Sequence, residues 1–253
     1  REGGFPSLPE CRVPAKPVCI GRLAGVRYLA VLLDESSGTE AVKLPPGRWV
    51  NRRSAARELG GGEYWITARG YELARWDRES RYCGRCGAGN LPTPGETGKV
   101  CESCGHREYP RITPAMIVAV VNDGRLLMAH AHKHRKGLFS VLAGFVEPGE
   151  SLEACVHREV AEETGVTLST VHYFGSQSWP FPYSLMVAFT AEAETEEIRL
   201  EDDEIGEAGW YTPEQILSIP EIPERLTVAR ALIDWFVDSY GNEATRRTHH
   251  QRP

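Results

Sequence analysis

The sequence predicts an α/β protein with a metal-binding module in its middle, and three observations support this fold class. Two Cys-x-x-Cys pairs lie close together in the chain, Cys83 with Cys86 and Cys101 with Cys104. After Pro114, apolar runs typical of strands alternate with segments of helical periodicity. Before the cysteines, short apolar runs and glycine-rich turns indicate a small α/β or β-rich domain. With 253 residues, 41% of them hydrophobic, the chain can bury a sizeable core.

Composition argues against two classes of protein. No apolar run reaches the roughly 18 residues of a membrane span, and we expect neither a span nor a secretory signal. The net charge is −6 and the pI is near 5.8, which argues against binding nucleic acid through bulk electrostatic attraction. Of the seven cysteines, the three outside the pairs show no pairing pattern: Cys11, Cys19 and Cys155. We therefore expect reduced thiols and a cytoplasmic protein.

Changes in composition divide the chain into four segments. They are an N-terminal domain at 1–78, the cysteine module at 79–110, a main α/β domain at 111–241 and a polar tail at 242–253. In the first segment, the apolar run Tyr28–Leu33 indicates a strand and Gly60–Gly62 indicates a turn. The composition of the tail predicts disorder.

The main domain opens with a predicted β-hairpin. Met116–Val121 is an unbroken apolar run, and Leu126–Met128 is a second one. Asp123-Gly124 lies between them and suits a tight primed turn. A further strand is expected over Leu138–Val146.

The helix that follows carries clear signals at both ends. Ser151 is a suitable N-cap, Glu153 suits the positive end of the helix dipole, and Gly165 suits the C-terminal position. Beyond this helix we expect a strand over 184–191, an acidic stretch over 192–204, and amphipathic helices near 213–218 and 224–240.

The four paired cysteines predict a structural zinc site. Fourteen residues separate Cys86 from Cys101, a distance that lets two short turns close on one tetrahedral ion. A glycine follows each pair, Gly87 and Gly105, and allows the turn to fold tightly around the sulfurs. Four thiolates saturate zinc and leave no open position, so the site is expected to be structural rather than redox-active.

The predicted helix gathers glutamates on one side. Glu159 and Glu163 are four residues apart and Glu162 lies between them, so their carboxylates converge. Such a cluster repels itself unless a cation sits in it, and oxygen ligands suit Mg²⁺ or Mn²⁺. Arg158 can pair with Glu162, while apolar residues line the opposite, core-facing side: Leu152, Val156 and Val160. A glutamate-rich helix face is by itself most often solvated surface.

A longer pattern around the helix resembles the Nudix box at every position. The matching residues are Gly144, Glu150, Arg158, Glu159, Val160, Glu162, Glu163, Gly165 and Val166. The resemblance implies a Nudix α/β/α sandwich with a mixed sheet, so that the main domain is a Nudix hydrolase domain. It also implies that Glu159 and Glu163 are the main metal ligands, that Glu162 and Glu150 support them, and that a diphosphate is the substrate.

A second motif resembles the signature of NADH pyrophosphatases within the Nudix superfamily. It runs from Ser176 to Ser184 and retains Gln177, Trp179 and Ser184, which the resemblance implies as substrate-binding residues. It departs from the family form at Ser178, where proline is usual, and at Tyr183. Taken alone, the Trp-Pro-Phe-Pro segment would suit a rigid packing turn or a dimer contact equally well.

The same resemblance implies roles for four single residues. Tyr109 and Phe145 are similar in position to aromatics that hold a flat base between them, although either would also suit an ordinary core. Glu204 resembles a further metal ligand supplied by a later loop. Ala229 falls where the family contacts its ligand through the backbone.

Together these features predict hydrolysis of NADH, and also of NAD⁺ and related dinucleotides, to nicotinamide mononucleotide and AMP. An alternative within the same chemistry is removal of the NAD cap from RNA 5′ ends, favoured by Arg107, Arg111, Lys133 and Arg135 and opposed by the acidic pI. A Nudix nucleotide sensor without catalysis would be expected to lack box carboxylates, and this chain keeps them all. Family members are commonly homodimers, so a homodimer is expected.

Overall fold

The structure is a computed structural model that describes residues 17–33, 61–133, 135–200 and 204–241, together with Arg48, Val50, Asn51, Ala55, Glu58 and Leu59. It divides into two compact units. The first comprises residues 1–112 with 180–183, and the second comprises residues 113–179 and 184–253. Cys11 and the expected disordered tail at 242–253 lie outside the described residues.

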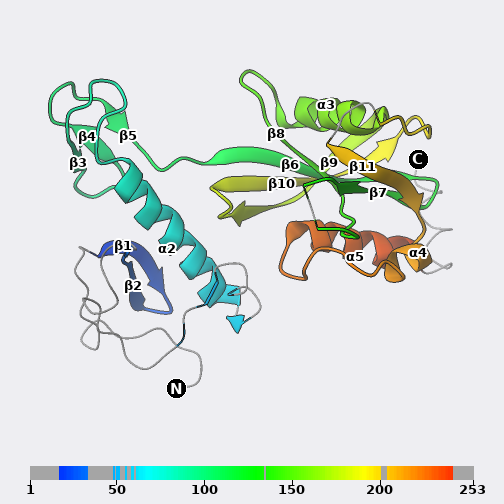
Figure 1. The fold of residues 1–253 in the computed structure, drawn as a ribbon, viewed down its shortest axis with the longest axis horizontal. Coiled ribbons are helices and arrows are strands. Elements are labelled where there is room, and N and C mark those ends of the chain that lie inside the picture. Colours follow the sequence, from blue (N-terminus) through cyan, green and yellow to red (C-terminus); the bar gives the residue numbers. More distant parts are fainter. Residues whose placement is uncertain are drawn as a thin grey trace. The chain divides into compact units, whose positions relative to one another are not determined.

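The first unit combines a small sheet, a long helix and the cysteine module (Figure 1). β1 (Val18–Leu23) and β2 (Val26–Ala30) form an antiparallel pair, and α2 spans Gly61–Glu79. β3 (Asn90–Pro92), β4 (Lys99–Cys101) and β5 (Arg107–Glu108) form a three-stranded antiparallel sheet.

Helix α2 corrects the prediction of a turn at Gly60–Gly62, because Gly61 and Gly62 form its first turn. Glycine weakens a helix by about 1 kcal/mol relative to alanine, so the sequence favours a turn here. The helix gains its stability from packing on the small sheet. A Cβ at Gly70 would lie only 3.0 Å from Ile20 Cδ1, and Arg69 Nε donates a hydrogen bond to the Ile20 carbonyl at 2.7 Å. Tertiary contacts therefore override local propensity in this segment.

The second unit is built on one mixed six-stranded sheet. Its order is β11-β7-β6-β10-β9, with β8 paired to β6 beside this path, and β6 and β10 run parallel while the other pairs are antiparallel. The strands are β6 (Thr113–Asn122), β7 (Arg125–Ala131), β8 (Leu142–Phe145), β9 (Leu168–Trp179), β10 (Ser184–Ala193) and β11 (Ile205–Tyr211). The helices are α3 (Leu152–Thr164), α4 (Pro213–Leu217) and α5 (Val228–Tyr240).

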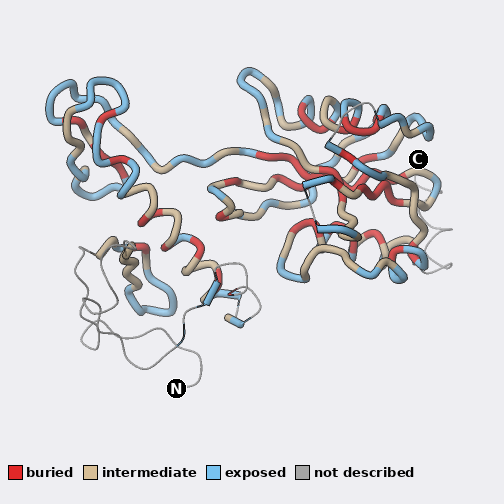
Figure 2. Tube along the Cα trace, in the orientation of Figure 1, coloured by how far each residue is buried: buried red, intermediate tan, exposed pale blue. Residues whose placement is uncertain are grey.

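Helices cover both faces of this sheet, which confirms the predicted α/β/α sandwich (Figure 1). Alternate residues of β6 point to opposite layers. Val118 packs in the cluster that contains Val156 and Val160 of α3, while Ala119 packs in the cluster that contains Phe236 of α5. Figure 2 shows the buried residues concentrated in the sheet and on the helix faces turned toward it. Among the described residues, no helix is both long and apolar enough to cross a membrane.

The predicted hairpin is confirmed, and several element boundaries are corrected. Asp123 and Gly124 have φ values of 45° and 69°, as a primed turn requires. The strand expected over Leu138–Val146 is shorter, because only Leu142–Phe145 pairs continuously with β6, while Leu138 and Ser140 make isolated bridges. The helix expected over 224–240 begins at Val228, with Thr227 as its N-cap.

Candidate active site

The zinc module brings its four cysteines together as the sequence predicts. The four sulfur atoms all lie within 4.8 Å of one another, with Cys83 to Cys104 at 3.7 Å and Cys86 to Cys101 at 3.4 Å. Tetrahedral zinc with Zn–S bonds of about 2.3 Å would place its sulfurs roughly 3.8 Å apart. The donor set and its spacing therefore fit a structural zinc ion.

The backbone of the two turns prepares these sulfurs for a cation. Gly87 and Gly105 have φ values of 77° and 69°, and backbone N–H groups point at the sulfurs of Cys83 and Cys101. Hydrogen bonds from the N–H of Cys104, and then of Ser103, lower the pKa of the Cys101 thiol to about 6. A thiolate forms easily there, which favours zinc binding.

A buried lysine connects the zinc module to helix α2 inside the first unit. Lys99 is 5% exposed, and its Nζ lies 2.9 Å from Asp77 Oδ1 and 2.6 Å from the Asp77 carbonyl oxygen. The same ammonium group sits 5.2 Å from the centre of the Trp76 ring. These contacts satisfy a buried charge, which would otherwise be costly, and they fasten the module to its own unit.

In the second unit, the loop before α3 places the glutamates of the helix. Gly149 adopts a φ of 89°, and Glu150 then accepts a hydrogen bond from the Glu147 backbone N–H at 3.0 Å. Ser151 caps the helix by accepting from the Ala154 N–H at 3.1 Å, and Gly165 ends it in the left-handed conformation. Both caps agree with the sequence prediction.

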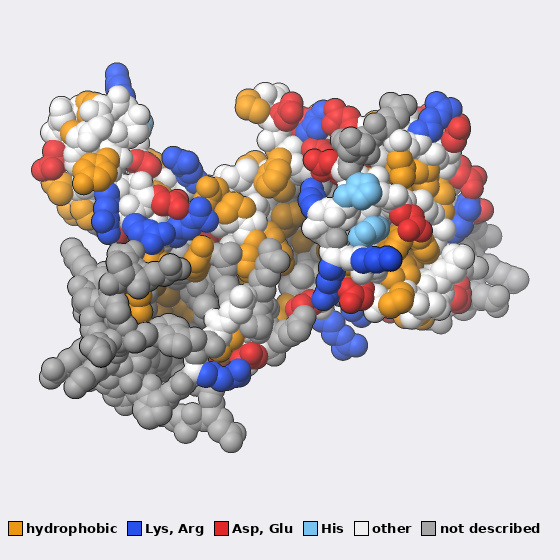
Figure 3. All heavy atoms as spheres, in the orientation of Figure 1, with side chains coloured by type: hydrophobic (Ala, Val, Ile, Leu, Met, Phe, Trp, Pro, Cys, Tyr) orange, Lys and Arg blue, Asp and Glu red, His pale blue; other side chains and the backbone are white. Residues whose placement is uncertain are grey.

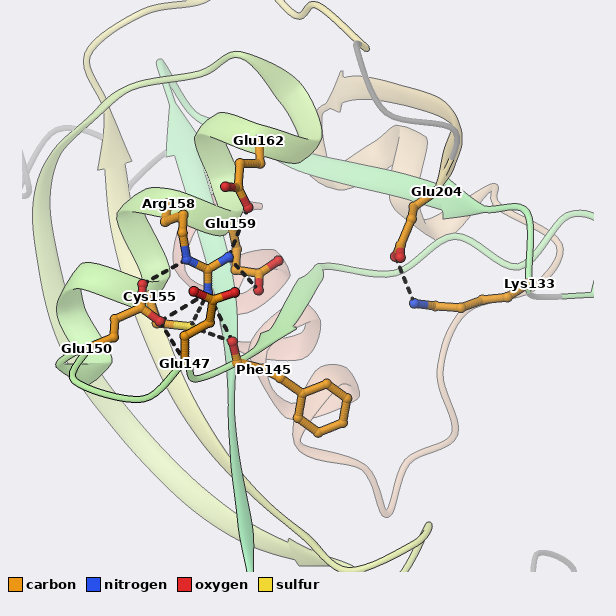
Figure 4. A network of polar contacts seen from close by, with 9 residues as sticks. All are labelled: Lys133, Phe145, Glu147, Glu150, Cys155, Arg158, Glu159, Glu162 and Glu204. Carbon is orange, nitrogen blue, oxygen red and sulfur yellow. Dashed lines mark hydrogen bonds and ion pairs between the residues drawn. The ribbon is translucent and has the colours of Figure 1, made fainter.

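Arg158 lies at the centre of the polar network on this helix (Figure 4). Its guanidinium group bonds both oxygens of Glu150 at 2.8 and 3.0 Å. It also donates to Glu159 at 3.0 Å and to Glu162 at 2.9 Å. The pair with Glu162 was predicted from the sequence, whereas the fork to Glu150 was not. One cation therefore brings three of the predicted site carboxylates together.

The ionisation of these carboxylates differs along the helix. Hydrogen bonds from Arg158, and then from the Glu147 N–H, lower the pKa of Glu150 to about 2. Burial raises the pKa of Glu159, and the contact with Arg158 opposes this rise. Glu163 is only 7% exposed, and its Oε2 atom is buried and accepts no hydrogen bond, although the residue takes part in another interaction. The donors are all carboxylate oxygens, the ligands that a hard divalent cation prefers, and three of the four carboxylates are ion-paired with Arg158.

Gly144 gives Glu159 the space that its carboxylate occupies. A Cβ atom built on Gly144 would lie 1.9 Å from Glu159 Cδ, far inside van der Waals contact. Gly144 belongs to β8, whereas Glu159 belongs to α3, so the missing side chain leaves room for the Glu159 carboxylate against the strand. The requirement for glycine at this position is therefore one of space rather than of backbone conformation.

The carbonyl of Phe145 is a feature that the sequence did not reveal. It accepts hydrogen bonds from Arg158 Nη2 at 3.0 Å and from the buried Cys155 thiol at 3.3 Å. Burial raises the pKa of this thiol to about 12, so Cys155 stays protonated and able to donate. Two donors from α3 thus hold the backbone beside Gly144.

Glu204 stands apart from the Arg158 network in Figure 4. It lies just before β11, and its Oε2 atom forms an ion pair with Lys133 Nζ at 3.1 Å. The side chains of Lys133 and Glu204 are 64% and 56% exposed. The structure thus places Glu204 in the same unit as the α3 glutamates but gives it a lysine partner.

The predicted substrate-binding residues fall into exposed and buried groups. Tyr109, in the first unit, is 48% exposed, and Phe145, in the second, is 54% exposed, so neither is an ordinary core residue. Ser184 is buried at 4% exposure, and Trp179 is partly buried. The Ala229 side chain packs in the core of the second unit, which leaves only its backbone for a ligand.

Gln177 has a structural contact that the sequence did not show. Its amide accepts from the Val228 N–H at 2.9 Å and donates to the Leu226 carbonyl at 2.7 Å. The side chain therefore links β9 to the start of α5, the segment that carries Ala229.

Comparisons with known proteins agree with this geometry. The NUDIX domain model matches residues 111–236, and the NADH pyrophosphatase zinc ribbon model matches residues 78–109. A relative from Chromobacterium violaceum, called NAD-capped RNA hydrolase NudC, is 38% identical over 232 residues, covering 89% of this chain and 86% of the relative. A relative of the same name from Escherichia coli is 44% identical over 227 residues, covering 90% and 87%. A solved NUDIX hydrolase from Nitrosomonas europaea shares the fold, with a TM-score of 0.54 at 19% identity, covering 68% of this chain and 94% of that one.

Proposed function

We propose, on the premise that this chain belongs to the NudC family of Nudix hydrolases, that it hydrolyses the diphosphate bond of NADH, NAD⁺ and NAD-capped RNA. From the free dinucleotides the products are nicotinamide mononucleotide and AMP. The observation that carries the proposal is the cluster of box glutamates that Arg158 draws together beside the loop at Phe145. Such a cluster suits cation-assisted cleavage of an anionic bridge.

The α3 glutamates are the proposed ligands of the catalytic cation. Glu159 and Glu163 act as main ligands, Glu150 and Glu162 support them, and Glu204 contributes from the loop before β11. Glu163 is 7% exposed, and the side chains of Glu150 and Glu159 are 13% and 15% exposed. The catalytic ion is Mg²⁺ or Mn²⁺, since the donors are all carboxylate oxygens. When bound, it neutralises charge on the diphosphate and lowers the pKa of a water molecule. The four cysteines hold a separate structural zinc, which requires reduced thiols and suits a cytoplasmic protein.

Arg158 acts as a positioning residue in this scheme. Because its five donors reach Glu150, Glu159, Glu162 and the Phe145 carbonyl, it fixes the carboxylates before a cation arrives. It also offsets part of the repulsion among them. The helix and the loop therefore form one rigid acidic face.

The exposed ring of Phe145 is proposed to stack on the nucleobase of the substrate, and Tyr109, an exposed aromatic residue of the first unit, stays a predicted substrate-binding residue. Gln177, Trp179, Ser184 and the backbone at Ala229 complete the proposed substrate contacts. Gln177 acts by holding the start of α5 in place. A homodimer is also proposed, and the terminal strand β9, which exposes Tyr173 at 64%, is a surface available for it.

The name of the relatives favours capped RNA as a substrate. The charge pattern, however, argues that the RNA chain itself adds little binding affinity. Three of the four basic residues singled out in the sequence are ion-paired: Arg107 with Glu96, Lys133 with Glu204 and Arg135 with Glu221. Figure 3 shows basic side chains next to acidic ones on the visible face of the second unit. We therefore expect the cap, rather than the RNA chain, to supply most of the affinity, and a shallow dependence on salt.

A substrate panel tests the proposal. It comprises NADH, NAD⁺, ADP-ribose, diadenosine polyphosphates and NAD-capped RNA, each with Mg²⁺ or Mn²⁺, and the products are identified by mass. Release of nicotinamide mononucleotide from NADH and from capped RNA is expected. Binding of these compounds without any product would instead identify a nucleotide sensor and contradict the proposal.

A further inference from the structure

The ion pair between Lys133 and Glu204 is held in place by backbone pairing. Lys133 follows β7 and Glu204 precedes β11, and these two strands are antiparallel with Ala131 opposite Ile205. The His132 N–H donates to the Glu204 carbonyl at 2.9 Å just beyond that pair. The pairing of the two strands therefore places the lysine and the glutamate side by side, although they are 71 positions apart in the sequence.

Gly206 and His132 are packed tightly beside this ion pair, whereas the pair itself is exposed. A Cβ at Gly206 would lie 2.7 Å from His132 Cε1, so the absence of a side chain at Gly206 leaves room for the His132 ring beside β11. Lys133 and Glu204 are nonetheless both more than half exposed. An exposed pair of this kind contributes little to stability, so either residue can exchange its partner at low cost.

We propose that Lys133 is an exchange cation for the active site, an inference that rests on the proposed function. In the enzyme without divalent metal, Lys133 neutralises Glu204. When the divalent cation takes Glu204 as a ligand, the ammonium group leaves that carboxylate and contacts a non-bridging phosphate oxygen of the substrate. Lys133 is thus a competitor of the metal ion and a binding residue for the diphosphate.

Charge and geometry support this exchange. A divalent cation outcompetes a single ammonium for a carboxylate, and the two cations repel each other at short distance. Lysine is a point charge on a flexible four-carbon stem, which lets it move from one oxygen to another without any backbone movement. A diphosphate bound to the metal brings negative charge to the same place, so the displaced ammonium group has a new partner.

The segment itself provides matched controls. Lys136 is exposed on the same segment and, among the residues that the structure describes, makes no ion pair. Arg135 pairs with Glu221 at 2.7 Å, so its acidic partner is a different one. Replacing Lys136 removes the same charge from the same segment without touching Glu204.

The test measures Mn²⁺ affinity and NADH affinity separately. Mn²⁺ is titrated into the full chain and followed by electron paramagnetic resonance for wild type, Lys133→Met and Lys136→Met. Lys133→Met is expected to bind Mn²⁺ about two- to fivefold more tightly, because the competing ion pair is lost. The same variant is expected to raise the KM for NADH by roughly three- to tenfold at saturating Mn²⁺. Lys136→Met should change neither value by more than about 1.5-fold.

If the exchange occurs, Lys133→Met should bind Mn²⁺ more tightly and NADH more weakly than the wild type. Equal Mn²⁺ affinities for the two lysine variants, or weaker binding by Lys133→Met, would overturn the proposal. A double-mutant cycle adds a second criterion, since Lys133→Met should no longer tighten Mn²⁺ binding when Glu204 is already glutamine. If wild type failed to hydrolyse NADH but Lys133→Met alone still tightened Mn²⁺ binding, the proposed function would fail and the competition at Glu204 would stand. If wild type hydrolysed NADH and the two variants bound Mn²⁺ alike, only the exchange would fail.

Discussion

The zinc ribbon and the acidic face of α3, the proposed site of the catalytic metal, are built in opposite ways. In the ribbon, four sulfurs from two turns of similar design already lie within 4.8 Å of one another. Backbone N–H groups and positive-φ glycines shape those turns. On α3, by contrast, a side-chain cation, Arg158, holds the carboxylates, and a lysine holds the more distant Glu204.

This difference reflects what each site has to do. A closed set of four thiolates keeps its ion and stabilises the surrounding turns. In the proposed scheme, Glu204 exchanges its lysine partner for a divalent cation, whereas Arg158 keeps its carboxylates in position. In the same scheme, the metal that supports structure and the metal that supports catalysis therefore bind at separate sites, one in each unit.

The largest effect is expected from breaking the closed site. Cys83→Ser should lose the zinc and unfold the ribbon, because binding of a structural zinc contributes on the order of 10 kcal/mol to folding. Zinc content and thermal unfolding are the measurements. Cys19→Ser is the control, since Cys19 is an exposed cysteine of the same unit outside the site. Full zinc content in Cys83→Ser would show that this cysteine is not a ligand.

A smaller but still large effect should follow from a change to the acidic face of α3. Glu163→Gln should reduce NADH turnover in Mg²⁺ by at least about 100-fold, because it removes a proposed ligand charge. The fold and the zinc content should not change. Glu153→Gln, at an exposed position of the same helix, is the matched control and should retain most activity. Unchanged turnover in Glu163→Gln would exclude this residue as a ligand.

The spatial role of Gly144 gives an intermediate effect. Gly144→Ala should lower activity by roughly 10- to 100-fold, because the new methyl group would displace the Glu159 carboxylate. Gly175→Ala is a good control, since nothing lies within 4 Å of a Cβ there and its φ does not require glycine. Equal activity of the two variants would mean that the position of Glu159 does not matter for the reaction.

The smallest effect concerns ionisation along α3 in the metal-free protein. Carbon-13 NMR of the carboxyl groups should show Glu150 titrating near pH 2 and Glu159 titrating above the ordinary value of 4.5. Because the pKa of Glu150 is depressed, its contribution to stability is present above pH 4.5 and is lost as the pH falls toward 2. For Glu159 the sign is reversed, and its ionisation above its raised pKa opposes folding.

The variant Arg158→Met tests whether Arg158 causes the lowered pKa of Glu150. Without the guanidinium, the pKa of Glu150 should return toward 4.5. The variant should therefore lose, above pH 4.5, the stability that Glu150 contributes in the wild type, and the change of stability with pH that Glu150 causes between about pH 2 and 4.5 should disappear. The pKa of Glu159 should rise further, because Arg158 lowers it in the wild type. A Glu150 pKa that stayed near 2 in this variant would show that the backbone N–H of Glu147 alone controls it.

Local signals in the sequence were sufficient for much of the second unit and for the zinc site of the first. Asp123-Gly124 predicted the turn, Ser151 and Gly165 predicted both ends of α3, and the cysteine spacing predicted the ribbon site. Each of these features depends on residues close together in the chain. Short-range chemistry therefore identifies them without any knowledge of tertiary packing.

The features that the sequence did not reveal depend on long-range contacts. Helix α2 depends on packing against Ile20, which overrides the low helix propensity of its glycines. The fork from Arg158 to Glu150 depends on the turn at Gly149, which brings the loop back to the helix. The pair of Lys133 with Glu204 depends on the pairing of β7 with β11. None of these contacts has a local signature.

The most direct test of the account is anomalous diffraction from crystals grown with manganese, recorded at both the manganese and the zinc absorption edges. We expect a zinc peak among the sulfurs of Cys83, Cys86, Cys101 and Cys104, and a separate manganese peak at the carboxylates of Glu159 and Glu163. Manganese found only at the cysteines, or no manganese beside α3 in crystals that hydrolyse NADH, would contradict the division between a structural and a catalytic metal site.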